Sequence, residues 1–252
     1  MTFFKKNTEE NVFYSPDELL STLANKFETD KGTADKMTLS WGKDWPGHET
    51  MGYTETYERY MKKNRENTIK LFEIGICDQR FPYASTKLWL SYFKNIDLYC
   101  VDNFWGHYLQ DKVEDVKNLN NLGINFIYAD QGNFCDWNEL KQQTPNDFDY
   151  FIEDGSHWPN HMAITLWQAC NMMKSGGYFF MEDIQNPEKS RGKFKYDNSL
   201  LAEDLLKSLS YGTFWTHFLN NKQIKDINDN FQLIEMVLDK HKINYLAIFR
   251  KK

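Results

Sequence analysis

Short apolar runs alternate with helical segments along the middle of the chain, and this alternation most constrains the fold. The apolar runs are Ile69–Ile76, Ile96–Val101, Ile124–Tyr128, Phe148–Glu153 and Gly177–Glu182. The segments between them have helical character: Thr86–Phe93, Lys112–Leu122, Trp137–Gln143 and His161–Lys174. Strands that alternate with helices in this way form a parallel sheet with right-handed crossovers. The sequence therefore predicts an α/β fold.

The end of the chain departs from this alternation. After a helix predicted over Tyr196–Leu209, two strand-like runs, Phe231–Leu238 and Ile243–Phe249, are joined by Asp239-Lys240-His241-Lys242. A connection this short makes a hairpin, so the last two strands should be antiparallel. We predict a Rossmann-like, doubly wound, mostly parallel seven-stranded sheet that ends in an antiparallel hairpin.

The first part of the chain is polar and aromatic and does not follow the strand–helix pattern. Helices are predicted over Pro16–Phe27 and Thr54–Asn64, and residues 28–52 between them read as a long loop. Long loops in compact domains often cover binding sites. We therefore expect residues 1–66 to form a helical and loop extension that acts as a lid, and residues 67–252 to form the main domain.

Composition narrows the function classes. The chain of 252 residues is 41% hydrophobic and carries a net charge of −6. This balance permits a full core and argues against nucleic-acid binding, which needs a basic face. The start of the chain does not resemble a signal peptide, no transmembrane run is present, and the four cysteines form no CxxC pair. We expect a cytoplasmic protein with reduced thiols and no membrane insertion.

The fourth and fifth apolar runs both end in carboxylates. Asp154 follows the fourth run, and Glu182 and Asp183 end the fifth. Because neighbouring parallel strands end at one edge of a sheet, these side chains should converge there. Hard carboxylate oxygens suit Mg²⁺ or Mn²⁺, and His157 just beyond suits a general base. The alternative for His157 is an ordinary exposed loop histidine, and for His161 we expect a structural role.

The first three runs end in residues that suit a small-molecule cofactor. Glu73 could face an amine-bearing or positively charged group, and Gly75 could let the backbone approach a ligand. Asp102 could accept hydrogen bonds from ribose hydroxyls, or it could be a helix N-cap or a loop aspartate. Asp130 could accept from an adenine amine, or it could be a solvated turn residue. The dinucleotide fingerprint GxGxxG is absent, because Cys77-Asp78-Gln79 follows the first run.

In this order the motifs resemble those of the class I S-adenosylmethionine-dependent methyltransferases, and more narrowly the metal-dependent sugar O-methyltransferases of the mycinamicin and macrocin group. The residues that carry the resemblance are Lys26-Phe27-Glu28-Thr29-Asp30-Lys31-Gly32, Gly52-Tyr53-Thr54 with Tyr57-Glu58, Glu73-Ile74-Gly75, Glu153-Asp154-Gly155-Ser156-His157 with His161, and Gly176-Gly177 with Glu182-Asp183. They extend from residue 26 to residue 183.

The resemblance implies a role for each of these positions. The metal ligands would be Asp154, Glu182 and Asp183, and the catalytic pair would be His157 as general base with Asp154. The cofactor pocket would include Glu73, Gly75, Asp102, Asp130, Gln131, Tyr53 and Asp154. The segment Cys77–Trp89 is longer and bulkier than the family's, which leaves the methionine end of the cofactor pocket undefined. Residues 67–252 would then be an S-adenosylmethionine-binding methyltransferase domain.

The resemblance also implies a reaction, namely methyl transfer from S-adenosylmethionine to a sugar hydroxyl with Mg²⁺ or Mn²⁺. The acceptor would be nucleotide-linked, or part of a cell-surface polysaccharide or a glycosylated metabolite. The basic segment Arg191–Lys195 could meet a phosphate or could be solvated surface. Alternatives are methylation of a phosphate, a phosphoramidate or a catechol-like molecule, a metal-dependent hydrolase, and a catalytically silent cofactor-binding partner. We expect a homo-oligomer.

Overall fold

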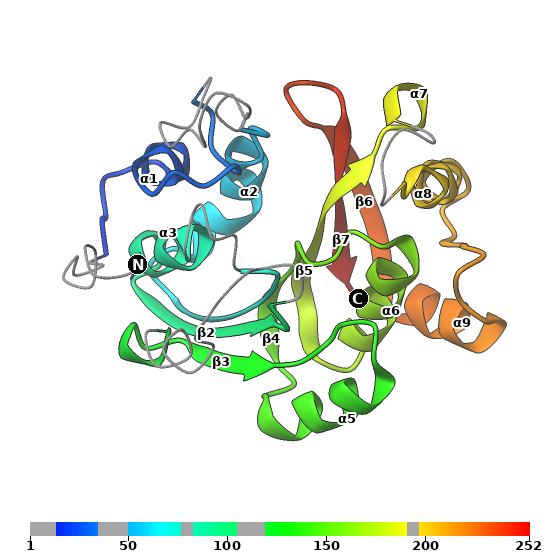
Figure 1. Ribbon diagram of the computed structural model, residues 1–252, viewed down its shortest axis with the longest axis horizontal. Coiled ribbons are helices and arrows are strands. Elements are labelled where there is room, and N and C mark those ends of the chain that lie inside the picture. The colour runs from blue at the N-terminus through cyan, green and yellow to red at the C-terminus, as the bar shows by residue number, and fades with distance from the viewer. Residues whose placement is uncertain (1–13, 35–49, 77–82, 105–118, 191–196) are drawn as a thin grey trace.

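The computed structural model describes residues 14–34, 50–76, 83–104, 119–190 and 197–252 (Figure 1). The helices are α1 (Leu20–Lys26), α2 (Thr54–Met61) with the 3-10 turn Lys62–Asn64, α3 (Ala84–Tyr92), α5 (Phe134–Gln143), α6 (Pro159–Ala169), α7 (Pro187–Ser190), α8 (Ser199–Tyr211) and α9 (Asn221–Asn230). The strands are β1 (Thr68–Ile74), β2 (Asn95–Asp102), β3 (Asn125–Tyr128), β4 (Phe148–Glu153), β5 (Met173–Gln185), β6 (Phe231–Leu238) and β7 (Asn244–Lys251). Most of the helix predicted over Lys112–Leu122 lies outside the described residues.

The strands form one seven-stranded sheet in the order β3-β2-β1-β4-β5-β7-β6. The pairs among β1 to β5 are parallel, and β7 runs antiparallel to both β5 and β6. The predicted fold class, including the terminal hairpin, is thereby confirmed. The strand order reverses between β1 and β4, which is where ligands bind in doubly wound sheets.

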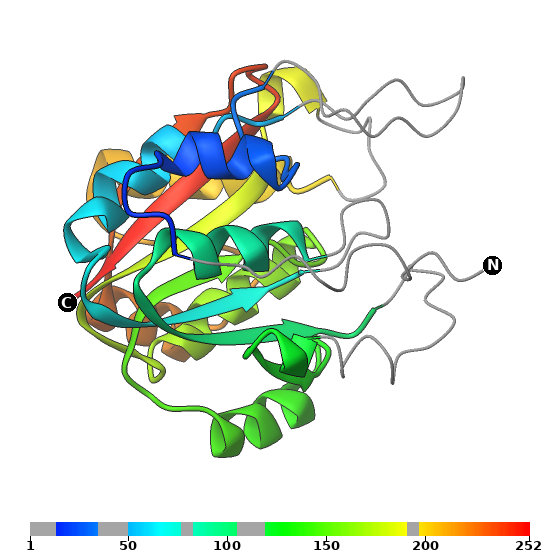
Figure 2. The ribbon, with the colours of Figure 1, turned by 90° about the vertical axis from the view of Figure 1, so that its left-hand side faces the viewer.

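Helices cover both faces of the sheet (Figures 1 and 2). Along β1, Leu71 and Phe72 enter different hydrophobic clusters, because successive strand residues point to opposite faces. The Phe72 cluster includes side chains of α5, α6, α8 and α9. The Leu71 cluster includes side chains of α1, α2 and α3. The described helices of the N-terminal segment therefore share their hydrophobic cluster with the strands that carry the candidate site.

Some element boundaries differ from the prediction. Helix α1 begins at Leu20 rather than Pro16, and β5 continues to Gln185, beyond the acidic pair. Helix α9 was not predicted, since its sequence is mostly polar and its only buried residue is Ile227. A capping box between Asn220 and Gln223 starts this helix instead. Among the described residues, no helix is long and apolar enough to cross a membrane.

Candidate active site

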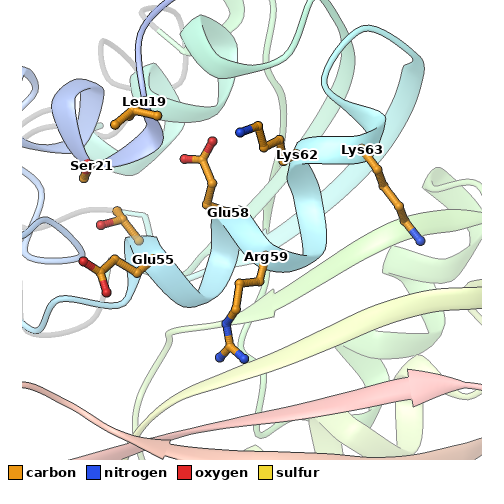
Figure 3. Close-up of a pocket in the computed structure, with 8 residues that line it drawn as sticks. Leu19, Ser21, Glu55, Glu58, Arg59, Lys62 and Lys63 are labelled. Carbon is orange, nitrogen blue, oxygen red and sulfur yellow. The ribbon is translucent and has the colours of Figure 1, made fainter.

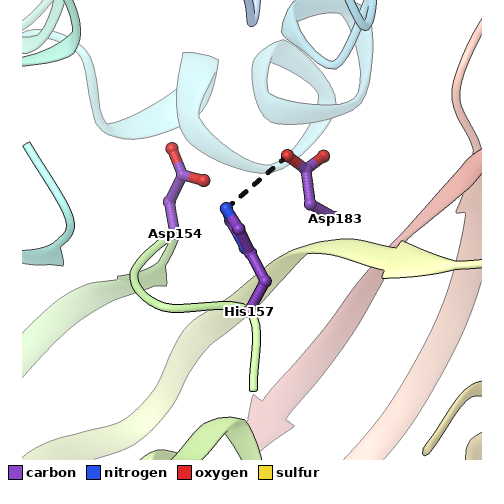
Figure 4. Close-up of side chains that lie close together, drawn as sticks. All are labelled: Asp154, His157 and Asp183. Atoms are coloured by element: carbon purple, nitrogen blue, oxygen red, sulfur yellow. Dashed lines mark ion pairs between the residues drawn. The ribbon is translucent and has the colours of Figure 1, made fainter. Parts of the chain in front are cut away.

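The carboxyl ends of β4 and β5 bring three candidate residues together, as predicted from their order. Asp154, His157 and Asp183 each offer a ligand atom, and these atoms lie within 4.8 Å of one another (Figure 4). His157 Nε2 is 4.0 Å from Asp183 Oδ2. Two carboxylates and an imidazole at these separations are a suitable donor set for a divalent cation.

Unusual backbone conformations aim two of these side chains. His157 has a φ of 56° and Asp183 a φ of 55°, both in the left-handed region. At Asp183 the register between β5 and β7 also shifts, between Met181 and Ile184. Non-glycine residues in this region cost energy, and they cluster at functional sites. The strain at these two positions, one in the loop after β4 and one within β5, therefore supports a functional assignment for this edge of the sheet.

Glu182 lies beside this group but faces another set of partners. Its Oε1 accepts a hydrogen bond from the Tyr57 hydroxyl, and its Oε2 accepts one from Lys31 Nζ at 2.9 Å. The side chain is almost completely buried. Both of its oxygens are thus engaged by the N-terminal segment, and the predicted role of Glu182 as a metal ligand stays a prediction.

The N-terminal segment supplies two further contacts to the carboxylates. Lys31 Nζ also donates to Asp154 Oδ2, and the Tyr53 hydroxyl donates to Asp183 Oδ1 at 2.9 Å. Tyr53 was predicted near the cofactor, whereas Lys31 and Tyr57 stood in the motifs that carry the resemblance but were given no role. The spacing of four residues between the two tyrosines, which puts them on one helix face, was a usable signal for Tyr57.

Burial and crowding shift the acid–base properties of the group. Burial raises the pKa of Asp154 to about 6, against the opposing effect of the Lys31 ammonium. Burial also raises the pKa of Glu182 and of Asp183. Burial alone would lower the pKa of His157, but the carboxylates of Asp183 and Asp154 raise it overall. The site is therefore rich in buried negative charge and favours a cation.

Glu73, at the end of β1, is a buried carboxyl group without a well-formed hydrogen bond from the described residues. Burial raises its pKa to about 7, although the Lys31 ammonium and the Trp89 indole favour the ionised form. Buried polar atoms normally have partners, so orphaned ones suggest a missing ligand. This observation fits a cofactor with an amine or hydroxyl donor.

Asp102 and Asp130 hold the loops that follow their strands. Asp102 accepts hydrogen bonds from the backbone N–H of Ile76 at 3.0 Å and of Phe104 at 2.6 Å. Asp130 accepts one from the backbone N–H of Gly132 at 2.8 Å. Both carboxylates are partly exposed at the carboxyl edge of the sheet. Their loop contacts match the structural alternative, and their ribose and adenine roles stay predictions.

Gln131 supports the loop after β4. Its Nε2 donates to Glu153 Oε1 at 2.8 Å, and its Oε1 accepts from the backbone N–H of Ser156 at 2.7 Å. Ser156 Oγ in turn lies 3.0 Å from His161 Nδ1. Gln131 and His161 thus position the segment that carries His157, while the predicted cofactor contact of Gln131 stays a prediction.

A groove of about 640 Å³ lies beside α2, and none of the carboxylates described above lines it (Figure 3). It is lined by Leu19, Ser21, Thr54, Glu55, Glu58, Arg59, Lys62 and Lys63. Several of its charged groups have partners: Glu58 accepts from the backbone N–H of Leu20, and Arg59 pairs with Glu235 at 3.1 Å. The groove is separate from the carboxylate group, which Tyr53 and Tyr57 face.

No family model matches the chain. Among curated proteins, mycinamicin VI 2''-O-methyltransferase of Micromonospora griseorubida is 24% identical over 135 residues, which is 52% of this chain and 31% of that protein. Demethylmacrocin O-methyltransferase of Streptomyces fradiae is 24% identical over 156 residues, 60% of this chain and 35% of that protein. The matched region is thus about a third of the length of these curated relatives.

The MycE methyltransferase from the mycinamycin biosynthetic pathway, solved in complex with Mg and SAH, has the same fold. Its TM-score is 0.59 at 19% identity, over 93% of this chain and 55% of that chain. This chain resembles the macrolide sugar O-methyltransferases. Its fold is the class I methyltransferase fold, as the motifs indicated.

Proposed function

We propose that this chain is an S-adenosylmethionine-dependent, divalent-metal-dependent O-methyltransferase that acts on a sugar hydroxyl. The observation that carries the proposal is the group Asp154, His157 and Asp183 at the carboxyl edge of the sheet. The orphaned carboxyl group of Glu73, two strands away from β5, supports a cofactor at the same edge. The named activities of the curated relatives supply the reaction type.

The carboxylates suit a divalent cation. Asp154 and Asp183 would hold Mg²⁺ or Mn²⁺, with Glu182 as a third ligand or as their neighbour, and these hard oxygens fit such ions. When bound, the metal would lower the pKa of the acceptor hydroxyl and fix its direction. Asp154 would then serve both the metal and the adjoining cofactor pocket.

To His157 we assign the role of general base, which takes the proton of the acceptor hydroxyl. Its imidazole points toward the space between Asp154 and Asp183 (Figure 4). As the hydroxyl oxygen attacks, a carbon–oxygen bond forms to the methyl group and the carbon–sulfur bond of the sulfonium breaks. The leaving thioether is neutral, so no acid is required, and the proton goes to His157.

Besides Asp154, six residues are assigned to the cofactor. We place the methionine end near Glu73, Gly75 and Tyr53, and the adenosine near the ends of β2 and β3. Asp102 would accept from the ribose hydroxyls, and Asp130 and Gln131 would lie near the adenine. Each strand end lies at the carboxyl edge where doubly wound sheets bind nucleotides.

The acceptor is proposed as a sugar: a small-molecule or nucleotide-linked sugar, a sugar of a cell-surface polysaccharide, or one on a glycosylated metabolite. The basic segment that could meet a phosphate, Arg191–Lys195, lies outside the described residues. The cytoplasmic location and the homo-oligomer also stay predictions. Methylation of a phosphate, a phosphoramidate or a catechol-like molecule is the alternative for the acceptor.

Isothermal titration with S-adenosylmethionine, with and without Mg²⁺, separates the competing functions. An O-methyltransferase binds the cofactor, and Glu73→Gln should weaken that binding at least tenfold. A metal-dependent hydrolase should not bind it, and that result would contradict the proposal. A silent partner should bind it but transfer no methyl group to any acceptor, whatever metal is added.

A further inference from the structure

We propose that Lys31 is a positioning residue of the metal site, an internal cation that aims Asp154 and restrains Glu182. The inference rests on the metal dependence proposed above. It assigns a role to the N-terminal segment beyond that of a lid, because the segment supplies charge to the centre of the site.

Lys31 is 1% exposed, and its ammonium lies between two carboxylates from different strands. One contact goes to Asp154 Oδ2, next to the end of β4, and the other goes to Glu182 Oε2, in β5, at 2.9 Å. Lysine is rarely buried unless it is paired. The sharing of one ammonium therefore fixes the separation of the two carboxylates.

The two carboxylates differ in how many of their oxygens the N-terminal segment engages. Asp154 gives Oδ2 to Lys31, so its Oδ1 is available to a ligand. Glu182 gives Oε2 to Lys31 and Oε1 to the Tyr57 hydroxyl. Asp154 joins the group with His157 and Asp183, and Glu182 does not. Lys31 thereby directs one carboxylate toward the metal and holds the other beside it.

The local backbone fixes Lys31 in place. Its carbonyl accepts from the backbone N–H of Thr54 at 3.1 Å, at the start of the helix that carries Tyr57. The carbonyl of the next residue, Gly32, accepts from the backbone N–H of Gly52 at 2.8 Å. A Cβ on Gly32 would lie 2.5 Å from Asn25 Oδ1, so this turn packs closely on α1. These backbone hydrogen bonds join the turn that carries Lys31 to the start of the helix that carries Tyr57, so the two donors to Glu182 are positioned together.

A simpler explanation is that Lys31 only stabilises the fold. Buried ion pairs are weak evidence for stability, because apolar replacements of the same shape are often neutral. Partners that orient metal ligands behave differently, since their loss typically weakens metal affinity by about 10- to 100-fold. Metal affinity therefore distinguishes a positioning role from a structural one.

The test is Mn²⁺ binding, measured by electron paramagnetic resonance on the full chain with Mn²⁺ alone as the probe. The variants are Lys31→Met, which is close to lysine in length and removes the charge, and Lys31→Arg, which keeps the charge. Lys26→Met is the matched control, because Lys26 lies in the same segment with its side chain 57% exposed. The melting temperature and the cooperativity of the thermal transition of each variant report its folding.

We expect Lys31→Met to weaken Mn²⁺ binding at least about tenfold while the variant still unfolds in a cooperative thermal transition. Lys31→Arg should bind Mn²⁺ closer to wild type than to Lys31→Met, and Lys26→Met should be unchanged. Equal or tighter Mn²⁺ binding by Lys31→Met would overturn the role, as would equal losses in both Lys31 variants. If wild type itself binds no Mn²⁺, the proposed metal dependence fails, and this inference fails with it.

Discussion

The carbonyl oxygen of Asp154 occupies the position where a side chain on Gly75 would begin. A Cβ on Gly75 would lie 1.8 Å from that oxygen, and the φ of Gly75 is +82°. The contact joins the end of β1, which carries Glu73, to the loop after β4, which carries Asp154 and His157. Gly75 was predicted to allow close approach of a ligand, and the structure shows that it allows close approach of this loop.

Gly75→Ala should therefore destabilise the protein strongly. The added methyl group collides with backbone that cannot move without shifting Asp154, so we expect a loss of about 3 kcal/mol or more in the free energy of unfolding. Gly123→Ala is the control, because Gly123 has a φ of +77° but open space around its missing Cβ. It should lose only about 1 kcal/mol. Urea titrations measure both free energies of unfolding. Equal losses in the two variants would show that the backbone around residue 75 moves to accept the methyl group.

Glu73→Gln should make the cofactor-free protein more stable at high pH. The Glu73 pKa is about 7 in the folded protein, against 4.5 for an ordinary glutamate. Between these values the unfolded chain has released this proton and the folded chain still holds it, so folding loses stability as pH rises. The loss is at most about 3 kcal/mol above pH 7.

Urea titrations of wild type and Glu73→Gln between about pH 5 and pH 8 measure this effect. The variant's advantage should be largest at pH 8 and should shrink toward pH 5, while its affinity for S-adenosylmethionine falls. A stability difference that is constant with pH would mean that Glu73 titrates normally.

Removal of the Tyr57 hydroxyl should be more costly than removal of the Tyr53 hydroxyl. Tyr57→Phe leaves a buried oxygen of Glu182 without its donor, and we expect a loss of about 1–3 kcal/mol. Asp183 is partly exposed, and its Oδ1 has a second contact with Asn244 Nδ2 at 3.4 Å. Tyr53→Phe should therefore cost less. Chemical denaturation of the two variants decides the order, and the reverse order would contradict these assignments.

His157→Ala should lower methyl transfer and leave cofactor binding intact. Loss of a general base typically lowers the rate by about 10²- to 10⁴-fold. His217→Ala is the matched control, because His217 lies after α8 and pairs with Asp204, away from the site. Turnover by His157→Ala within twofold of wild type would remove His157 from the base role.

Much of the site could be predicted because its residues follow strand ends. Asp154 and Asp183 lie where the chain leaves or bends at a strand, and neighbouring parallel strands end at one edge. The different directions of Glu182 and Asp183 could be anticipated only in part. Consecutive strand residues alternate in direction, but the left-handed φ of Asp183 depends on tertiary packing.

Lys31 could not be located by such reasoning. It lies in a loop, so no periodicity gives its direction, and its partners are more than a hundred residues away in the chain. Its burial depends on how α1 and α2 pack on the sheet, which local sequence does not encode. The polar helix α9 was missed for another reason, since Ile224 and Ile227 are its only apolar residues and two such positions are too few to mark a helix.

The most direct test of the proposed function is transfer of a labelled methyl group from S-adenosylmethionine to a panel of sugar-bearing small molecules. We predict labelled product with its methyl group on a sugar oxygen, abolished by a chelator, restored by Mg²⁺, and nearly absent in Asp183→Asn. Transfer that proceeds undiminished after metal removal, or equally in Asp183→Asn, would contradict a metal-dependent O-methyltransferase.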